Sequence, residues 1–240
     1  MFNFKQQMLE NQKEAKFNLN SEKLSVVYQP IYYLEKNEIF GYEGLSRIHA
    51  SNFSNIMELI KLAEEHHRAH DLDLLMMEKV IKNFKGQGKL FINILAKNAE
   101  ETKEYLTKMI EVAANVNLSL DRVIIELSER IEWDLESLAV IKESRTIHKF
   151  LLAIDDFGAG FANSILLLNA QPDFVKIDRM IIEKIHKNER QQILVNGFMK
   201  VLKEFGAEVI CEGIEEKEEL ETLRALGSDY GQGYYLGRPI

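Results

Sequence analysis

The segment LLAIDDFGAG, residues 151–160, ends an apolar run on two adjacent carboxylates, Asp155 and Asp156. Neighbouring carboxylates repel each other, and each loses favourable hydration when it leaves water. Two interpretations follow from this pattern. The pair can lie in solvent at a strand end or at a helix N-cap, or a cation can compensate its charge in a binding site.

Polar residues also interrupt or follow the other apolar runs of the chain. Taken run by run, they are Gln29, Glu43, Asn93, Glu126, Asp155 with Asp156, Lys176, Glu212 and Gln232. A strand buried between a barrel interior and outer helices is normally apolar throughout, so this recurrence favours one shared site. Carboxylate and amide oxygens without histidine or thiol ligands favour hard divalent cations such as Mg²⁺ or Mn²⁺ over zinc or copper.

Such a site suits phosphoryl transfer. Two ions about 3.5 to 4 Å apart stabilise the attacking and leaving oxygens of an in-line displacement. We expect one acid of the Asp155–Asp156 pair to bridge the two ions while the other binds the second ion. Lys176 is the only cation of the set, and it could orient the attacking hydroxide or stabilise charge in the transition state.

The hydrophobic pattern predicts the elements that position these residues. Runs at 24–34 and 38–48, joined by a turn, predict an antiparallel hairpin. Six short apolar strands follow and alternate with amphipathic segments. The helical segments are expected near residues 54–84, 97–116, 134–148, 161–169, 179–204 and 215–226.

Eight strands with outer helices predict an α/β fold, a modified TIM (β/α)₈ barrel with an irregular, antiparallel first strand. An open doubly wound sheet is the alternative, although it usually has fewer strands. Three prolines and no low-complexity stretch leave no linker between two domains. We expect one barrel domain over residues 21–240, preceded by a polar helix or tail at 1–20.

The composition excludes several classes of protein. A net charge of −8 argues against binding to a nucleic-acid polymer or to an anionic membrane surface. No apolar run reaches the roughly 18 residues of a membrane span, and the polar N-terminal segment is not typical of a signal peptide. A single cysteine, Cys211, excludes an internal disulfide framework. These features predict a cytoplasmic protein.

The chain resembles the EAL-domain cyclic di-GMP phosphodiesterases from Tyr28 to Pro239. The matching motifs, in family order, are YQPI, GYEGLSR, FINI, IIELSER, AIDDFGAGF, VKIDR, CEGIE and QGYYLGRP. The resemblance implies a modified barrel that binds cyclic di-GMP and hydrolyses one phosphodiester bond to give linear pGpG with Mg²⁺ or Mn²⁺. It also implies a homodimer.

The resemblance also implies roles for single residues. The family's metal ligands fall on Glu43, Asn93, Glu126, Asp155, Asp156 and Glu212. The positions that touch the dinucleotide are Gln29, Ser46, Arg47, the segment 212–215 with Glu215, and Tyr234. Lys176 takes the place of the lysine that contacts the nucleophilic water, Gln232 supports the metal centre, and Glu129 steadies the loop after the fifth strand. Arg47 suits a phosphate because a guanidinium can fork onto it, although a structural salt bridge is the alternative.

The chain departs from the family pattern in places. Gly44 stands where alanine is usual, Ile48 where an aromatic residue is common, and Leu95 where serine is usual. The loop at 159–163 has fewer hydroxyl side chains than the family pattern favours. A catalytically weak domain that acts as a cyclic di-GMP receptor or a protein-interaction module is therefore an alternative to the active enzyme. Hydrolysis of a different phosphodiester is a further one.

Three other patterns have simple explanations. GAGFAN at 158–163 suggests a dinucleotide fingerprint, but Asn163 replaces the third glycine and two acids precede the loop. His66 and His70 lie one helical turn apart without a third zinc ligand nearby, which favours a solvated helix face. Cys211 lies on an apolar strand, which favours a small buried side chain over a nucleophile.

Overall fold

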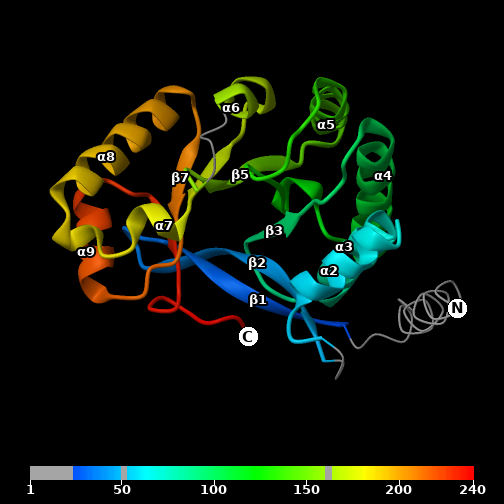
Figure 1. Ribbon diagram of the computed structural model, residues 1–240, viewed down its shortest axis with the longest axis horizontal. Coiled ribbons are helices and arrows are strands. Elements are labelled where there is room, and N and C mark those ends of the chain that lie inside the picture. The colour runs from blue at the N-terminus through cyan, green and yellow to red at the C-terminus, as the bar shows by residue number, and fades with distance from the viewer. Residues whose placement is uncertain (1–23, 50–52, 160–163) are drawn as a thin grey trace, which may run out of the picture.

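The computed structural model describes residues 24–49, 53–159 and 164–240, so the predicted helix or tail at 1–20 lies outside the described residues. Eight strands follow one another around a closed barrel (Figure 1), which confirms the predicted fold class. They are β1 Leu24–Tyr33, β2 Glu38–Ile48, β3 Lys89–Asn93, β4 Val123–Ser128, β5 Leu151–Phe157, β6 Phe174–Ile177, β7 Glu208–Cys211 and β8 Tyr230–Gln232.

β1 runs against the direction of the other strands. It pairs in antiparallel fashion with β2 and with β8, whereas every pair from β2–β3 to β7–β8 is parallel. A turn at 34–37 joins β1 to β2, and its last residue, Asn37, adopts the left-handed conformation with φ of 55°. A two-strand hairpin connected this tightly can only be antiparallel, so the reversal follows from the short turn.

Helices cover the outside of the barrel (Figure 1). They are α2 Ile56–Glu65, α3 Ala69–Asn83, α4 Ala99–Asn115, α5 Leu135–His148, α6 Ser164–Ala170, α7 Arg179–Ile182, α8 Glu189–Glu204 and α9 Lys217–Ala225. The single helix expected at 179–204 is wrong, because α7 ends early and a 3₁₀ turn, Ile185–Lys187, separates it from α8. Lys184, at this break, is in the left-handed conformation.

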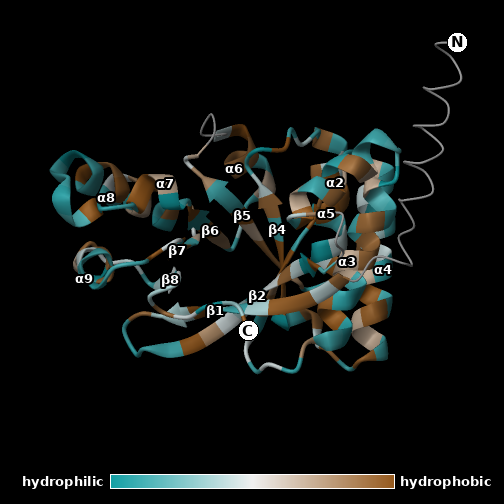
Figure 2. Ribbon diagram, turned by 60° about the horizontal axis from the view of Figure 1, so that its bottom comes forward, coloured by the Kyte–Doolittle hydropathy of each residue, from teal (hydrophilic) through white to brown (hydrophobic). Residues whose placement is uncertain are grey.

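Side chains of the helices divide sharply between core and solvent. Figure 2 shows hydrophobic residues along β4 and β5 and hydrophilic residues on the outward faces of the outer helices. Asparagine or aspartate caps begin several helices, since the side chains of Asn55, Asn98, Asp134 and Asn188 accept backbone N–H groups of the first turn. In the described part of the chain, no helix combines the length and the apolar composition that a membrane crossing requires.

Two layers of side chains fill the barrel. The lower layer is apolar and consists of Ile31, Phe91, Ile124, Ala153, Phe174, Ile210 and Tyr230. Successive strand residues point to opposite faces, so a step of two residues along a strand stays inside the barrel. That step leads from the lower layer to Gln29, Asn93, Glu126, Asp155, Lys176, Glu212 and Gln232. The strand-end residues singled out in the sequence therefore share an upper, polar layer.

Asp73 on α3 makes the stability of the fold depend on pH. It is 2% exposed, and its Oδ2 accepts the backbone N–H of Leu95 at 2.8 Å. Burial raises the pKa of this carboxyl to about 8. The unfolded chain releases the same proton at about pH 4. Protonated Asp73 is therefore compatible with the fold at low pH, and stability falls as the pH rises from about 4 toward 8.

We expect Asp73→Asn to stabilise the protein above neutral pH, because an amide oxygen accepts the same hydrogen bond without a charge. The free energy of unfolding should rise by roughly 1 to 3 kcal/mol at pH 8, and the gain should vanish at low pH. Urea denaturation across this range measures the effect, with the exposed Asp71→Asn on the same helix as the control. An Asp73→Asn protein less stable than the parent at pH 8 would contradict the expectation.

Candidate functional site

A buried ammonium group lies at the centre of the polar layer. Lys176 on β6 is fully buried. Its Nζ lies 2.6 Å from a carboxylate oxygen of Glu126 and of Glu212, 3.1 Å from Asp155 and 3.3 Å from Glu43. β2, β4 and β5 each contribute one of these acids, and the fourth, Glu212, directly follows β7. Adjacent strands of a closed barrel thus bring together charges that lie far apart in the sequence.

The charges of this cluster do not balance. Burial alone would lower the pKa of Lys176, but the surrounding carboxylates, Asp155 foremost, outweigh it and raise that pKa well above its ordinary value. Burial raises the pKa of Glu126 and of Glu212 well above the ordinary value, and Lys176 opposes that shift only in part. One ammonium cannot neutralise four carboxylates, so protons or bound cations must supply the remaining positive charge.

Three of the acids are arranged as metal ligands. Oxygens of Glu43, Glu126 and Asp155 lie within 4.8 Å of one another, and they form the only such group of His, Cys, Asp or Glu in the described parts of the chain. Glu126 Oε1 and Asp155 Oδ1 are buried and accept no hydrogen bond there, although Lys176 lies at ion-pair distance from both. Oxygen-only donors of this kind fit a hard divalent cation.

Two amides hold the acids in place. Asn93 Nδ2 donates to Glu43 at 3.3 Å and to Glu126 at 3.0 Å. Gln232 Nε2 donates to the other oxygen of Glu43 at 2.7 Å, while Gln232 Oε1 is buried without a hydrogen-bond partner among the described residues. Glu43 is thereby oriented from both neighbouring sides, which is the supporting geometry expected around a metal ligand.

Asp156 lies apart from this group. Its backbone has φ of 60°, and its carboxylate accepts the Ser128 hydroxyl at 3.1 Å and contacts Arg130 Nε at 3.1 Å. Burial, followed by the charge of Asp155, raises the pKa of Asp156 to about 6. The structure therefore does not bring the two neighbouring acids to one point, and only Asp155 joins the carboxylate cluster.

Glu129 fixes the loop that follows β5. Its carboxylate accepts the Gly158 backbone N–H at 2.7 Å, and its own N–H donates to the Asp155 carbonyl at 3.0 Å. Gly158 has φ of +90°, and a Cβ there would lie 3.0 Å from Ile181. Glu129 thus lies where a residue that steadies this loop is expected. Residues 160–163, most of the loop with few hydroxyls, lie outside the described residues.

Two cavities are lined in part by residues of the polar layer. One, of about 350 Å³, is lined by Gln29, Glu215 and Tyr234, together with the acids Glu43 and Glu212. The other has a volume of about 240 Å³ and mostly apolar walls, and it contains Ser46 and Arg47 as well as Asn93. Leu45 lines both cavities. The residues predicted to touch a substrate therefore surround the layer that carries the predicted metal ligands.

The side chains at these cavities differ in how they are held. Arg47 Nη1 donates to the Ser46 carbonyl at 3.0 Å, and no acid pairs with Arg47 in the described part of the chain. Arg179 forms a two-point ion pair with Glu215. Tyr234 is half-exposed, and the Arg238 guanidinium lies 4.5 Å from the centre of its ring.

No role was predicted from the sequence for three charged residues that lie at the site. Arg130 contacts Asp156 and also Asp178, at 3.3 Å, and Arg179 pairs with Glu215. Both arginines come shortly after a strand that carries a site residue, which is a usable signal. The third is Glu219.

Glu219 lies in the helical segment expected at 215–226 and is only 2% exposed. Its carboxylate accepts the backbone N–H groups of Lys184, Glu215 and Glu216 at 2.8, 2.9 and 3.1 Å. The spacing from Glu216 to Glu219 is that of a capping box, which the structure contains.

The other singled-out residues have ordinary environments. His70 Nε2 lies 3.0 Å from a Glu104 oxygen. Cys211 is fully buried, burial raises its pKa to about 12, and its Sγ lies 3.3 Å from the Ser228 hydroxyl. A thiol of this kind is protonated at neutral pH and is a poor nucleophile.

Comparison with known protein families matches the EAL domain over residues 10–239. The chain is 29% identical over 143 residues to the cyclic di-GMP phosphodiesterase PdeB of Shewanella oneidensis. The aligned segment covers 59% of this chain and 16% of that protein. It is 25% identical over 240 residues to the oxygen sensor protein DosP of Escherichia coli. This alignment covers 95% of this chain and 29% of that protein. The chain thus spans less than a third of the length of each of these relatives.

Solved structures resemble the whole barrel. A standalone versatile EAL protein from Vibrio cholerae O395, in a form with bound c-di-GMP, is 28% identical with a TM-score of 0.80, over 91% of this chain and 93% of that one. The calcium and cyclic di-GMP complex of BlrP1 from Klebsiella pneumoniae is 26% identical with a TM-score of 0.78, over 90% of this chain and 55% of that one.

The uncompensated charge of the polar layer predicts that divalent cations stabilise the protein. We expect Mn²⁺ or Mg²⁺, added at about a hundredfold excess over its dissociation constant, to raise the melting temperature by about 5 °C or more relative to EDTA. Glu126→Gln should abolish most of this shift, since it removes one charge of the cluster. Glu111→Gln, an exposed acid on α4, is the control. An equal shift in Glu126→Gln and in the parent would place the cation elsewhere.

Proposed function

The chain belongs to the EAL domain family, and on this premise we propose that it is a metal-dependent phosphodiesterase that hydrolyses cyclic di-GMP to linear pGpG. The observation that carries the proposal is the carboxylate cluster around Lys176, two of whose acids, Glu43 and Glu212, line the cavity that also holds the predicted substrate residues Gln29, Glu215 and Tyr234. Phosphodiester cleavage requires compensation of the negative charge that builds up on the phosphoryl oxygens. A site that binds divalent cations supplies this compensating charge.

The proposed metal ligands are Glu43, Asn93, Glu126, Asp155, Asp156 and Glu212. When bound, Mg²⁺ or Mn²⁺ polarises the phosphoryl oxygens and lowers the pKa of a bound water. Glu43, Glu126 and Asp155 have the spacing of one ion site. Asp156 is assigned to a second ion on the family resemblance alone, because its carboxylate contacts Arg130 in this structure.

Lys176 is the proposed residue beside the attacking water. Its pKa is raised, so the ammonium stays protonated and donates hydrogen bonds at neutral pH. A fixed positive charge at this place attracts a hydroxide and stabilises the charge that develops on the phosphate. Gln232 and Asn93 keep Glu43 in position by the hydrogen bonds already described.

The proposed substrate contacts are made by Gln29, Ser46, Arg47, Glu215 and Tyr234. Arg47 has no carboxylate partner in the described residues, so its guanidinium is available to a phosphate. Tyr234 offers an exposed aromatic face on which a base can stack. The acid layer alone would repel a dianionic dinucleotide, which is why both Arg47 and bound cations are needed.

The decisive experiment is incubation of the purified protein with cyclic di-GMP and Mn²⁺ or Mg²⁺, followed by chromatographic detection of pGpG. We expect product that disappears when a chelator is added. Glu43→Gln and Asp155→Asn should each lower turnover by a factor of about 10³ or more, because each removes a ligand charge. The fold should persist, as judged by circular dichroism, and Glu111→Gln should hydrolyse at the parental rate.

Two outcomes would overturn the proposal. Unchanged turnover in Glu43→Gln or Asp155→Asn would remove the acid cluster from catalysis. Intact cyclic di-GMP at high protein and metal concentration, together with binding in calorimetry, would favour the receptor interpretation. Competition by other phosphodiesters would test whether the substrate assignment is too narrow.

The proposal includes a homodimer, which rests on the family resemblance. Apolar side chains of α6 and α8 that are exposed in the monomer support it, among them Ile165, Leu168, Ile193 and Val201. Light scattering at concentrations where the protein is active should give twice the monomer mass. A single species of monomer mass under those conditions would contradict the dimer.

A further inference from the structure

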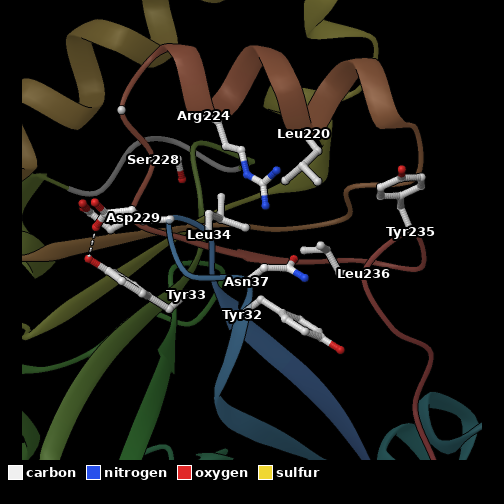
Figure 3. A pocket seen from close by; sticks show the side chains of 12 residues that line it. Tyr32, Tyr33, Leu34, Asn37, Leu220, Arg224, Ser228, Asp229, Tyr235 and Leu236 are labelled. Carbon is white, nitrogen blue, oxygen red and sulfur yellow. Dashed lines mark hydrogen bonds between the residues drawn. The ribbon is translucent and has the colours of Figure 1, made fainter.

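A large groove lies outside the site described above. Its volume is about 890 Å³, compared with about 350 and 240 Å³ for the two cavities that residues of the polar layer line in part. Its walls come from the end of β1 and the following turn, from α9 and its connection to β8, and from the segment after β8 (Figure 3). No residue of the polar layer lines it.

One cation in this groove has no partner among the residues that the structure describes. Arg224 extends from α9 toward the turn that carries Asn37 (Figure 3). Its guanidinium makes no ion pair or hydrogen bond with the residues of ranges 24–49, 53–159 and 164–240. The two acids of the groove are engaged, since Glu35 accepts the Tyr33 hydroxyl at 2.8 Å and Asp229 pairs with Lys203 at 2.8 Å. Arg224 is therefore the charged side chain of the groove that has no partner among the described residues.

Aromatic and apolar side chains surround this charge. The rings of Tyr32 and Tyr235 lie beside the same opening (Figure 3), and neither hydroxyl has a partner in the described part of the chain. Leu34 and Leu220 are buried at the groove wall. Tyrosine rings offer stacking faces, and hydroxyl, amide and guanidinium groups offer hydrogen bonds to a polar edge.

Charged side chains of both signs lie beside the groove. An adjoining hollow of about 600 Å³ shares Tyr33 and Asp229 with it and is lined by Lys36 and Lys203. The Lys36 ammonium lies 5.4 Å from the centre of the Tyr33 ring. The three basic side chains on this side, Lys36, Lys203 and Arg224, are matched in number by the acids Glu35, Glu208 and Asp229 that line the two hollows. Recognition of an anionic ligand would therefore rest on the Arg224 guanidinium and not on a general positive field.

We propose that this groove is a second binding site, for a nucleoside monophosphate. The volume is within the range of about 300 to 1,000 Å³ that small-molecule sites have. The base stacks on a tyrosine ring and forms hydrogen bonds with the Asn37 amide. The phosphate forms a bidentate ion pair with the Arg224 guanidinium. A simple anion would not need the aromatic walls, and a neutral aromatic molecule would not need the unpaired arginine.

Calorimetric titration of the full chain with GMP, in EDTA so that no metal-bound nucleotide forms at the acid cluster, tests the proposal. We expect one GMP per chain, and at least tenfold weaker binding to Arg224→Ala. Tyr235→Ala should also weaken it severalfold, and guanosine, which lacks the phosphate, should bind more weakly than GMP. Arg190→Ala, which removes an exposed arginine on α8, is the matched control. Arg224 is exposed, so its loss should leave the melting temperature unchanged.

Three results would overturn the proposal. The first is absence of GMP binding at millimolar concentration. The second is equal affinity of Arg224→Ala and the parent, combined with loss of binding in Glu43→Gln, which would assign GMP to the acid cluster. The third is inorganic phosphate binding as tightly as GMP, with no effect of Tyr235→Ala, which would reduce the groove to a simple anion site. None of these readouts depends on hydrolysis, so they are separate from the test of the proposed activity.

Discussion

The ion cluster around Lys176 is the constraint on which the rest of the molecule depends. A fully buried ammonium and four carboxylates are tolerated only when they compensate one another at close range, because each would be costly to bury alone. The apolar layer below, from Ile31 to Tyr230, excludes water from beneath the cluster. Low local polarity strengthens every electrostatic interaction above it, which is the condition a charge-stabilising site needs.

Buried carboxylates with compensating partners also hold the loops around the cluster. Glu129 accepts the backbone N–H of Gly158, and Glu219 accepts three backbone N–H groups at the start of α9 and at the break after α7. Both acids are buried, and both fix loops that would otherwise have unsatisfied donors. Catalytic side chains on loops require such anchoring, since a loop has no neighbouring strand to hold it.

The hydrophobic pattern was sufficient to predict the barrel, its reversed first strand and most of the polar layer. The period of two along a strand carries that information, because Glu126 or Lys176 can reach the interior only from one face. The placement of Asp156 could not be predicted in this way. The pairing of β5 with β6 shifts register between Ile154 and Phe157, and Asp156 adopts a positive φ, so the two adjacent acids diverge.

Other features that the sequence pattern did not predict also have physical causes. The break between α7 and α8 depends on Lys184, whose left-handed backbone is held by Glu219, a residue 35 positions further along. Helical periodicity within one window contains no information about such a contact. The roles of Arg130 and Arg179 likewise depend on which loops lie side by side, and the large groove exists only once α9 packs across the end of β1.

The antiparallel pairing of β1 with β8 has a consequence for how the molecule assembles. Ile31 pairs with Gln232, so barrel closure joins segments separated by about 200 residues and has a loop-closure cost that local contacts do not share. Gln232 bonds Glu43 at that same seam, so the acid cluster is complete only in the closed barrel. A folding intermediate with an open seam would contain every ligand residue and still lack the site. The proposed cation site is therefore a property of the closed barrel and not of any segment of the chain.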